Sequence, residues 1–407
     1  MTTRTLVLLL TLLVTAPAFA AELDVARPEE VGLSSARLAR LEQALRADVE
    51  KGRIPGAVVL IARKGRVASV QTVGVLDPAT RAPMTPDAIF RLASMTKPMV
   101  TVAALSLYEE GRLLLGDPVS KYIPALKGLT VGLERAPAAR EMTVQDLMRH
   151  TSGLTYGNRG TGEIYKLYPQ SSNESSLTLT MDEFIAKLSK APLLSQPGTQ
   201  WDYSLSTDVL GRVVEVAAGK PLHEVLVERI YRPLGMTDTS FVVPGEKRAR
   251  VAQPLAKHPD TGADYKLPDP TLPRKFDCGG GCAVSTAADY ARFAQMLLNR
   301  GALNGARVLA PKTVELMTAD HLVGISRGPS YIAGPGYTWG LGLAVREERG
   351  VAPMMGSAGD FYWPGAYATY WWADPREQLV VVSMQQSPFG RHYQQLVRAL
   401  VYQAIAE

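Results

Sequence analysis

The sequence predicts an α+β fold in which both ends of the chain build one lobe and a mostly helical lobe is inserted between them. Short runs of apolar and β-branched residues, typical of paired strands, lie near both ends, and amphipathic helical patterns fill the middle. The chain has 407 residues, of which 46% are hydrophobic and 20% are charged. This length suits one large domain with an insertion, or two lobes around one cleft.

The first twenty residues are typical of a secretory signal peptide. Arg4 supplies the positive charge, residues 6–14 the short apolar run, and Ala18-Phe19-Ala20 the cleavage site. The apolar run ends at Pro17 and is too short to span a bilayer comfortably. Because no cysteine stands at the cleavage point, we expect no lipid anchor and no stable membrane anchor. Residues 21–407 are therefore expected to form a periplasmic or secreted protein.

The α/β lobe is predicted to comprise about residues 21–90 and 335–407. Ser34 or Ser35 can cap a helix that Gly52 ends, and residues 57–62 and 67–73 then form a hairpin turned at Lys64-Gly65. Near the other end, residues 368–372 and 379–384 form a second strand pair. The chain closes with an amphipathic helix whose apolar face consists of Leu396, Val397, Leu400, Val401 and Ile405. The sheet is thus expected to be antiparallel and flanked by the first and last helices.

The helical lobe is predicted to span about residues 91–334. Its expected helices cover residues 99–110, 144–149, 181–188, 207–218, 222–231, 287–298 and 313–318. Two stretches, 156–176 and 257–277, are rich in glycine, proline and polar residues and are expected to be irregular. Long loops inside a compact protein often shape a binding site, so we expect these two to border the cleft between the lobes.

The distribution of charge and the spacing of the histidines argue against nucleic-acid binding and metal binding. The net charge is +5, or +4 without Arg4, and no basic run occurs, so nucleic-acid binding is not expected. The five histidines show no metal-ligand spacing, and we expect no metal site. Cys278 and Cys282 flank three glycines, and the spacing leaves open whether they form a disulfide or remain free thiols.

Ser94 and Lys97 form the only S-x-x-K in the chain. Residues three apart share a helix face, so the lysine is held beside the serine hydroxyl, which is a weak nucleophile without such help. At a helix start, free N–H groups can stabilise negative charge. We expect burial to lower the pKa of Lys97 and to let it accept or relay a proton. Chance alone gives about one S-x-x-K in a chain of this length, so the motif needs support from elsewhere.

Two downstream segments provide that support. Tyr203 precedes a predicted helix, and a lysine ammonium beside its phenol would favour the phenolate and make it a general base. Residues 363–370 are expected to open the terminal strand pair, with Gly365 letting a substrate approach the strand backbone. The backbone N–H groups of Ser94 and Ala366 are then predicted to form an oxyanion hole.

In the order and spacing of these motifs, Ser94-Met95-Thr96-Lys97, Tyr203-Ser204-Leu205 and Trp363-Pro364-Gly365, the chain resembles the serine β-lactamase and penicillin-binding-protein superfamily. Within it, the chain looks most like the β-lactamase-related family VIII carboxylesterases. Further matches lie at residues 83–85, 89–91, 146–154, 233–239, 339–342 and 371–375. The resemblance implies a β-lactamase/transpeptidase-like fold with the active site between the lobes. It also implies Ser94 as nucleophile, Lys97 as base or proton relay, and Tyr203 as general base.

Departures from the family pattern bear on the substrate. Leu205 stands where β-lactamases usually carry an asparagine, and Trp363-Pro364-Gly365 replaces Lys-Thr-Gly. The missing groups would bind the acylamino group and the carboxylate of a β-lactam or peptide, and each missing hydrogen bond costs about 1–3 kcal/mol. An uncharged acyl ester therefore fits better. The residues predicted to contact it are Trp363, Gly365, Leu205 and Tyr337.

Gly324-Ile325-Ser326-Arg327-Gly328 offers a competing nucleophile, since it matches the G-x-S-x-G elbow of α/β-hydrolases. That elbow needs a strand before it and a helix after it. Here a predicted helix precedes the motif and loop residues follow it. We therefore expect Ser326 to play no such role.

The sequence predicts a serine hydrolase that cleaves a small carboxylic ester through a Ser94 acyl-enzyme, without metal or organic cofactor. A β-lactamase, D-amino peptidase, amidase or acyltransferase on the same machinery is the alternative. A non-catalytic cell-wall-binding protein that retains the fold is a second alternative, of a different class.

Overall fold

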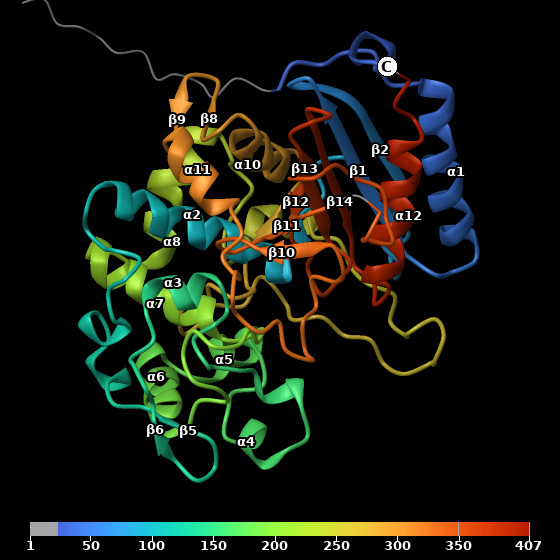
Figure 1. The fold of residues 1–407 in the computed structure, drawn as a ribbon. Coiled ribbons are helices and arrows are strands. Elements are labelled where there is room, and N and C mark those ends of the chain that lie inside the picture. The colour runs from blue at the N-terminus through green and yellow to red at the C-terminus, as the bar shows by residue number, and fades with distance from the viewer. Residues whose placement is uncertain (1–22, 349, 407) are drawn as a thin grey trace, which may run out of the picture.

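The computed structural model describes residues 23–348 and 350–406, so the predicted signal peptide lies outside the described residues. One antiparallel sheet dominates one side of the molecule, and helices fill the other (Figure 1). The strands of this sheet follow the order β10-β11-β12-β13-β14-β1-β2-β3. They are β1 Gly56–Arg63, β2 Arg66–Asp77, β3 Ala82–Pro83, β10 Tyr337–Trp339, β11 Ala344–Arg346, β12 Phe361–Tyr362, β13 Tyr370–Asp374 and β14 Leu379–Gln385.

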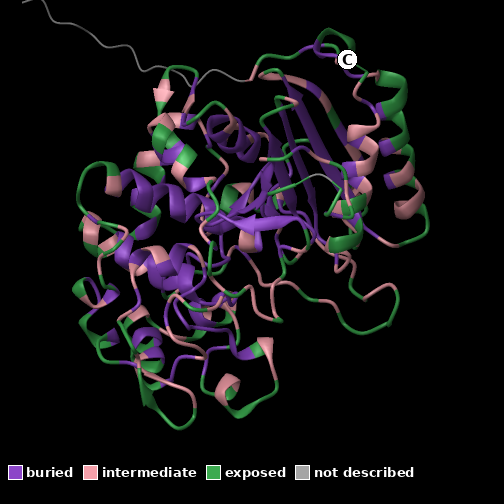
Figure 2. Cartoon of the chain, viewed as in Figure 1, coloured by how far each residue is buried: buried purple, intermediate pink, exposed green. Residues whose placement is uncertain are grey.

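The two ends of the chain meet at the centre of this sheet. β1 from the N-terminal part pairs with β14 from the C-terminal part, from Ala57 opposite Gln385 to Arg63 opposite Leu379. The hairpin of β1 and β2 turns where predicted, with Lys64 at φ 52° and Gly65 at φ 76°, the left-handed backbone that such a tight turn requires. The two central strands of the sheet, β1 and β14, are buried along their whole length, as Figure 2 shows.

The helices of the described chain are α1 Ser35–Glu50, α2 Thr96–Glu109, α3 Val144–Met148, α4 Glu163–Lys166, α5 Ser172–Thr178, α6 Met181–Lys190, α7 Ser206–Ala218, α8 Leu222–Leu226, α9 Arg232–Leu234, α10 Ala287–Leu298, α11 Pro311–Met317 and α12 Gly390–Tyr402. The predicted helices are present. Residues 222–231 are divided into α8 and a π-helical turn, Val227–Tyr231.

Helices cover both faces of the sheet. α1, capped by the Ser34 hydroxyl, packs beside α12 on one face (Figure 1). α10 packs on the other face, against β1, β13 and β14. The predicted boundary at residue 334 is therefore wrong for α10, which belongs to the sheet lobe. The physical reason is that a central sheet buried on both faces needs a second covering layer, and the nearest amphipathic helix in space supplies it.

The helical lobe is built around α2, α3, α7 and α8, which pack on one another. Residues 156–176, predicted to be irregular, contain α4 and the start of α5. The hydroxyl of Ser171 caps α5 by accepting from the Glu174 N–H, a local signal that the polar composition obscured. Residues 257–277 form no helix or strand, as predicted.

Short strand pairs lie outside the main sheet. Their strands are β4 Phe90–Arg91 with β7 Val284–Ser285, β5 Thr130–Val131 with β6 Ala136–Pro137, and β8 Ala302–Leu303 with β9 Ala306–Arg307. Cys278 and Cys282, just before β7, are joined in a disulfide with their Cα atoms 5.5 Å apart. The disulfide brackets the Gly279-Gly280-Gly281 turn, which reaches the site described next.

Candidate active site

Ser94 lies in a tight turn between β4 and α2. A 3-10 turn, Ala93–Met95, precedes the helix, and Ala93 adopts a left-handed φ of 48°. The Thr96 hydroxyl holds this turn by donating to the Ala93 carbonyl at 2.7 Å and accepting from the Ala283 N–H at 3.1 Å. A non-glycine residue at positive φ persists only where its surroundings enforce it, so the backbone around Ser94 is rigidly constrained.

Lys97, in the first turn of α2, is fully buried beside Ser94. Its ammonium makes three hydrogen bonds: to Ser94 Oγ at 3.4 Å, to Tyr156 Oη at 3.2 Å and to the Gly280 carbonyl at 2.6 Å. The same nitrogen lies 4.4 Å from the ring centroid of Tyr203. The structure therefore brings Ser94, Lys97 and Tyr203 together, as the sequence predicts.

The predicted pKa shift of Lys97 is wrong in direction. Burial alone lowers the pKa of the ammonium, but the phenol oxygens of Tyr156 and Tyr203 and the carboxylate of Asp208 outweigh it and raise the pKa above its ordinary value. Lys97 therefore remains an ammonium at neutral pH. In this structure the ammonium is a hydrogen-bond donor to Ser94, Tyr156 and Gly280.

A buried polar network behind Lys97 was not predicted from the sequence. Asp208, fully buried in α7, accepts hydrogen bonds from Ser172 Oγ at 2.7 Å and from the Gly280 N–H at 2.8 Å. Ser172 also contacts Tyr156 Oη at 3.3 Å. The backbone N–H and C=O of Gly280 thus link the Asp208 carboxylate to the Lys97 ammonium. Asp208 stands five residues after Tyr203, a spacing that carries no signal without the fold.

Tyr203 lies on the segment that leads into α7, and its side chain is 8% exposed. Its hydroxyl accepts a hydrogen bond from Trp363 Nε1 at 3.0 Å, and its ring contacts His150 at 4.7 Å between centroids. Burial, followed by the charges of Lys97 and Arg159, holds the pKa of His150 well below its usual range. His150 is therefore neutral, and its Nδ1 pairs with Ser204 Oγ at 3.3 Å.

The segment that carries Trp363 is not part of a strand, which corrects the prediction. It connects β12 to β13, and its Gly365 packs against the protein itself. A Cβ on Gly365 would lie 2.1 Å from the Leu92 carbonyl oxygen, so the residue must be glycine to let this loop close on the Ser94 turn. Ala366 is exposed next to Ser94, and in the described residues neither backbone N–H donates to a protein acceptor.

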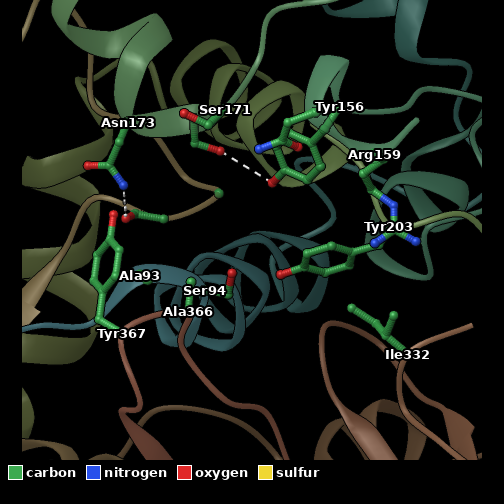
Figure 3. Close-up of a pocket in the computed structure, with 14 residues that line it drawn as sticks. Ala93, Ser94, Tyr156, Arg159, Ser171, Asn173, Tyr203, Ile332, Ala366 and Tyr367 are labelled. Carbon is green, nitrogen blue, oxygen red and sulfur yellow. Dashed lines mark hydrogen bonds between the residues drawn. The ribbon is translucent and has the colours of Figure 1, made fainter. Parts of the chain in front are cut away.

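A cavity of about 280 Å³ opens over Ser94 (Figure 3). It is lined by Ala93, Ser94, Tyr156, Asn158, Arg159, Ser171, Ser172, Asn173, Tyr203, Gly280, Gly281, Ile332, Ala366 and Tyr367. Of the two long polar stretches, residues 156–176 contribute to this wall as predicted, and residues 257–277 do not. The wall brings together the Ser94 hydroxyl, the backbone of Ala366 and the Tyr203 side chain.

The four residues predicted to contact substrate do not line this cavity. Leu205 is fully buried in the core, and Tyr337 is buried with its hydroxyl on Asp360 Oδ1 at 3.1 Å. Trp363 is 2% exposed and is turned toward Tyr203, and Gly365 packs on the Ser94 turn. The apolar side chains that were expected to face a substrate pack against the protein instead. The sequence did not reveal this, because its pattern does not show to which side of the loop a side chain points.

Ser326 does not form a nucleophile elbow. Its segment lies between α11 and β10, and its N–H donates to the Thr199 carbonyl at 3.1 Å. No strand leads directly into it and no helix follows it directly. Within the described residues, His, Cys, Asp and Glu side chains do not gather in threes as metal-binding groups. None of the helices there is long and apolar enough to cross a membrane.

Comparison with known proteins matches this geometry. The family described as Beta-lactamase matches residues 41–404. Esterase EstB of Burkholderia gladioli is 31% identical over 390 residues, covering 91% of this chain and 95% of EstB. Monacolin J acid methylbutanoyltransferase of Aspergillus terreus is 30% identical over 300 residues, covering 68% of this chain and 69% of that enzyme.

Among solved structures, EstCE1, described as a hydrolase with promiscuous acyltransferase activity, superposes with a TM-score of 0.77 at 30% identity. The match covers 90% of this chain and 99% of EstCE1. The motifs, the fold and these relatives agree on one lineage. The chain belongs to the beta-lactamase family, as a serine hydrolase of the β-lactamase and penicillin-binding-protein superfamily related to the family VIII carboxylesterases.

Proposed function

We propose that this serine hydrolase cleaves carboxylic esters through an acyl-enzyme on Ser94. The observation that carries the proposal is the position of Ser94 Oγ, 3.4 Å from the buried Lys97 ammonium and open to the cavity. The names of two relatives, an esterase and a hydrolase with acyltransferase activity, support the same reaction class.

In the proposed mechanism Tyr203 moves the protons and Lys97 keeps its charge. Tyr203 acts as a phenolate, which the neighbouring ammonium stabilises. As Ser94 Oγ bonds to the ester carbonyl carbon, its proton passes to this phenolate and forms the neutral phenol. The backbone N–H groups of Ser94 and Ala366 hold the oxyanion. The intermediate then expels the alcohol, which takes the proton from Tyr203. Water repeats the sequence and releases the acid.

Two features favour an ester over a β-lactam or a peptide. The indole of Trp363, which stands in place of a lysine, is turned onto Tyr203 and offers no cation to a substrate carboxylate. Leu205, which stands in place of an asparagine, is buried and offers no amide to an acylamino group. A peptide or penicillin would therefore leave polar groups unpaired, which disfavours its transition state.

Labelling and a substrate panel test the proposal together. A fluorophosphonate is expected to label the wild type and not Ser94→Ala, and p-nitrophenyl esters from acetate to dodecanoate are expected to turn over faster than nitrocefin. If the folded wild type remains unlabelled, the chain is a binding protein and the proposal fails. If nitrocefin is the better substrate, the enzyme is a β-lactamase instead.

Acyl transfer is a second candidate, favoured by the names of two relatives. An acceptor alcohol can replace water at the acyl-enzyme by the same proton path through Tyr203. The test adds short alcohols to the ester assay and measures transesterified product. If the amount of transesterified product grows with the alcohol concentration and total ester turnover rises, the enzyme transfers acyl groups. If the release of free acid is unchanged by the alcohol, the enzyme only hydrolyses the ester.

We also propose that residues 1–20 direct the protein to the periplasm or the medium. Their charge, apolar run and small-residue end support this. Fractionation of the producing cells with N-terminal sequencing tests it. A mature chain starting at Ala21 outside the cytoplasm is expected, and an uncleaved chain in the cytoplasm would contradict it.

A further inference from the structure

Arg159 places a positive charge on the wall of the cavity. It is the one charged side chain among the residues that line the cavity, and no carboxylate lines it. The Lys97 ammonium lies just behind the wall, where its hydrogen bonds to Ser94, Tyr156 and Gly280 occupy it. Arg159 is therefore the one cation that a substrate meets on the cavity wall.

The guanidinium of Arg159 is only partly used by the protein. Its Nη2 donates to the Ser330 carbonyl at 2.8 Å, while Asp202 Oδ1 lies farther away, at 3.7 Å. Its Nε has no hydrogen-bond partner in the described part of the chain. A guanidinium has five N–H groups, and leaving them unpaired in a partly closed site is unfavourable. Its side chain is 17% exposed, so part of it remains within reach of a ligand.

Asp202 compensates Arg159 poorly. Its carboxyl is 3% exposed, and its Oδ2 has no hydrogen-bond partner among the described residues. Burial raises the pKa of Asp202 despite the neighbouring guanidinium. The ion pair with Asp202 is therefore long, and it leaves N–H groups of the guanidinium unfilled.

Arg159 lies at the end of the cavity where the leaving group departs. Figure 3 shows Tyr203 between Ser94 and Arg159, with Ile332 on the same side, and Asn173 and Tyr367 at the opposite end. The guanidinium carbon is 5.8 Å from the Tyr203 ring centroid. Because Tyr203 protonates the leaving alcohol in the proposed mechanism, the alcohol portion of the ester points toward Arg159.

We propose that Arg159 binds a carboxylate on the alcohol portion of the substrate, so that the preferred substrates are esters of hydroxy acids. The proposal rests on the proposed ester hydrolysis and revises the expectation of an uncharged ester. The lysine that would bind a carboxylate elsewhere in the family is replaced by Trp363, and in this chain Arg159 supplies the cation from the 156–176 segment instead. The apolar side chain of Ile332, 40% exposed, borders the path between Tyr203 and the guanidinium.

A pair of esters that differ only in charge tests the proposal. 4-Butyryloxybenzoate and 4-butyryloxybenzamide have the same acyl group and nearly the same shape, and one carries a carboxylate on the alcohol side. The quantity measured is the ratio of kcat/KM for the anionic ester to that for the neutral ester. In Arg159→Gln this ratio is expected to fall about tenfold to a hundredfold, as for the loss of a charge-assisted hydrogen bond. Arg159→Lys is expected to retain part of it.

The ratio separates recognition from folding, because a loss of folded enzyme lowers both rates equally. Arg81→Gln, an exposed arginine in the turn between β2 and β3, removes the same charge away from the cavity and is expected to keep the wild-type ratio. An Arg159→Gln ratio equal to wild type would overturn the proposal. A second pair, p-nitrophenyl hemisuccinate and p-nitrophenyl butyrate, differs in charge on the acyl side. If Arg159→Gln lowers the ratio of kcat/KM only for this pair, the proposal is also overturned. If wild type hydrolyses none of these esters, ester hydrolysis itself fails instead.

Discussion

Replacing Trp363 by phenylalanine tests whether this residue contacts the substrate or positions Tyr203. The sequence predicts substrate contact, whereas the structure has the indole 2% exposed with Nε1 on Tyr203 Oη at 3.0 Å. Phenylalanine keeps an aromatic ring against Trp339, whose ring centroid is 4.4 Å away, and removes the donor. The two readings therefore predict effects on different kinetic constants.

The indole N–H stabilises the Tyr203 phenolate that takes the Ser94 proton in the proposed mechanism, so loss of this hydrogen bond acts on the chemical step. A hydrogen bond to a charged group contributes about 1.5–3 kcal/mol, which corresponds to roughly a 10- to 150-fold fall in kcat. KM is expected to change little, because Trp363 does not line the cavity. Loss of buried indole volume also lowers stability, by about 1–3 kcal/mol.

The assay measures kcat and KM on p-nitrophenyl butyrate together with the melting temperature. Trp371→Phe is the matched control, since this buried indole has no hydrogen-bond partner in the described structure and packs against Tyr290 and Phe293. It is expected to lose stability and to keep kcat. The fall caused by Trp363→Phe is expected to vanish in a Tyr203→Phe background. A rise in KM with unchanged kcat would refute the positioning role.

The remaining predictions concern the glycine turn, its disulfide and a buried carboxylate. Gly280→Ala places a Cβ 2.4 Å from Asp208 Oδ2, which displaces the carbonyl that holds the lysine ammonium, and kcat is expected to fall at least about tenfold. The Cys278→Ser/Cys282→Ser double variant frees the same turn, and we expect both a lower kcat and a loss of about 2 kcal/mol in unfolding free energy. Burial alone raises the pKa of Asp146, but hydrogen bonds from neighbouring arginines and threonines lower it from 3.8 to about 2. Its ionised form therefore stabilises the fold above about pH 4, and about 2 kcal/mol is lost as the pH falls from about 4 to 2.

Each of these predictions has a control. Gly116→Ala, at an exposed glycine with open space around it, is expected to leave kcat unchanged, and wild-type kcat in Gly280→Ala would contradict the role of the turn. Reduction of the wild type with dithiothreitol is expected to reproduce the double serine variant, and full activity after reduction speaks against it. Urea unfolding between pH 2 and 6 measures the acid effect, which is expected to flatten in Asp146→Asn. If the unfolding free energy of Asp146→Asn falls with pH as steeply as that of the wild type, other groups cause the loss of stability in acid.

Local sequence pattern predicted the parts of this protein that depend on residues close together in the chain. The hairpin at Lys64-Gly65, the helix that follows Ser94, the capped start of α1 and the helix α10 are where periodicity and capping indicated. Ser94 and Lys97 face each other because three residues make nearly one helical turn. The family and its serine hydrolase chemistry followed from three such motifs and their order.

Tertiary structure decided what depends on contacts between distant segments. The charge of Lys97 is set by tyrosines and an aspartate from other segments, so the sequence predicted the wrong direction of its pKa shift. Gly365 is required by the Leu92 carbonyl and not by a substrate, and α10 covers the sheet although it lies within the helical insertion. Arg159 carried no signal in the sequence, because an arginine in a polar stretch is ordinary. Its importance comes from the cavity wall that folding builds around it, where charge, burial and distance are properties of neighbours in space.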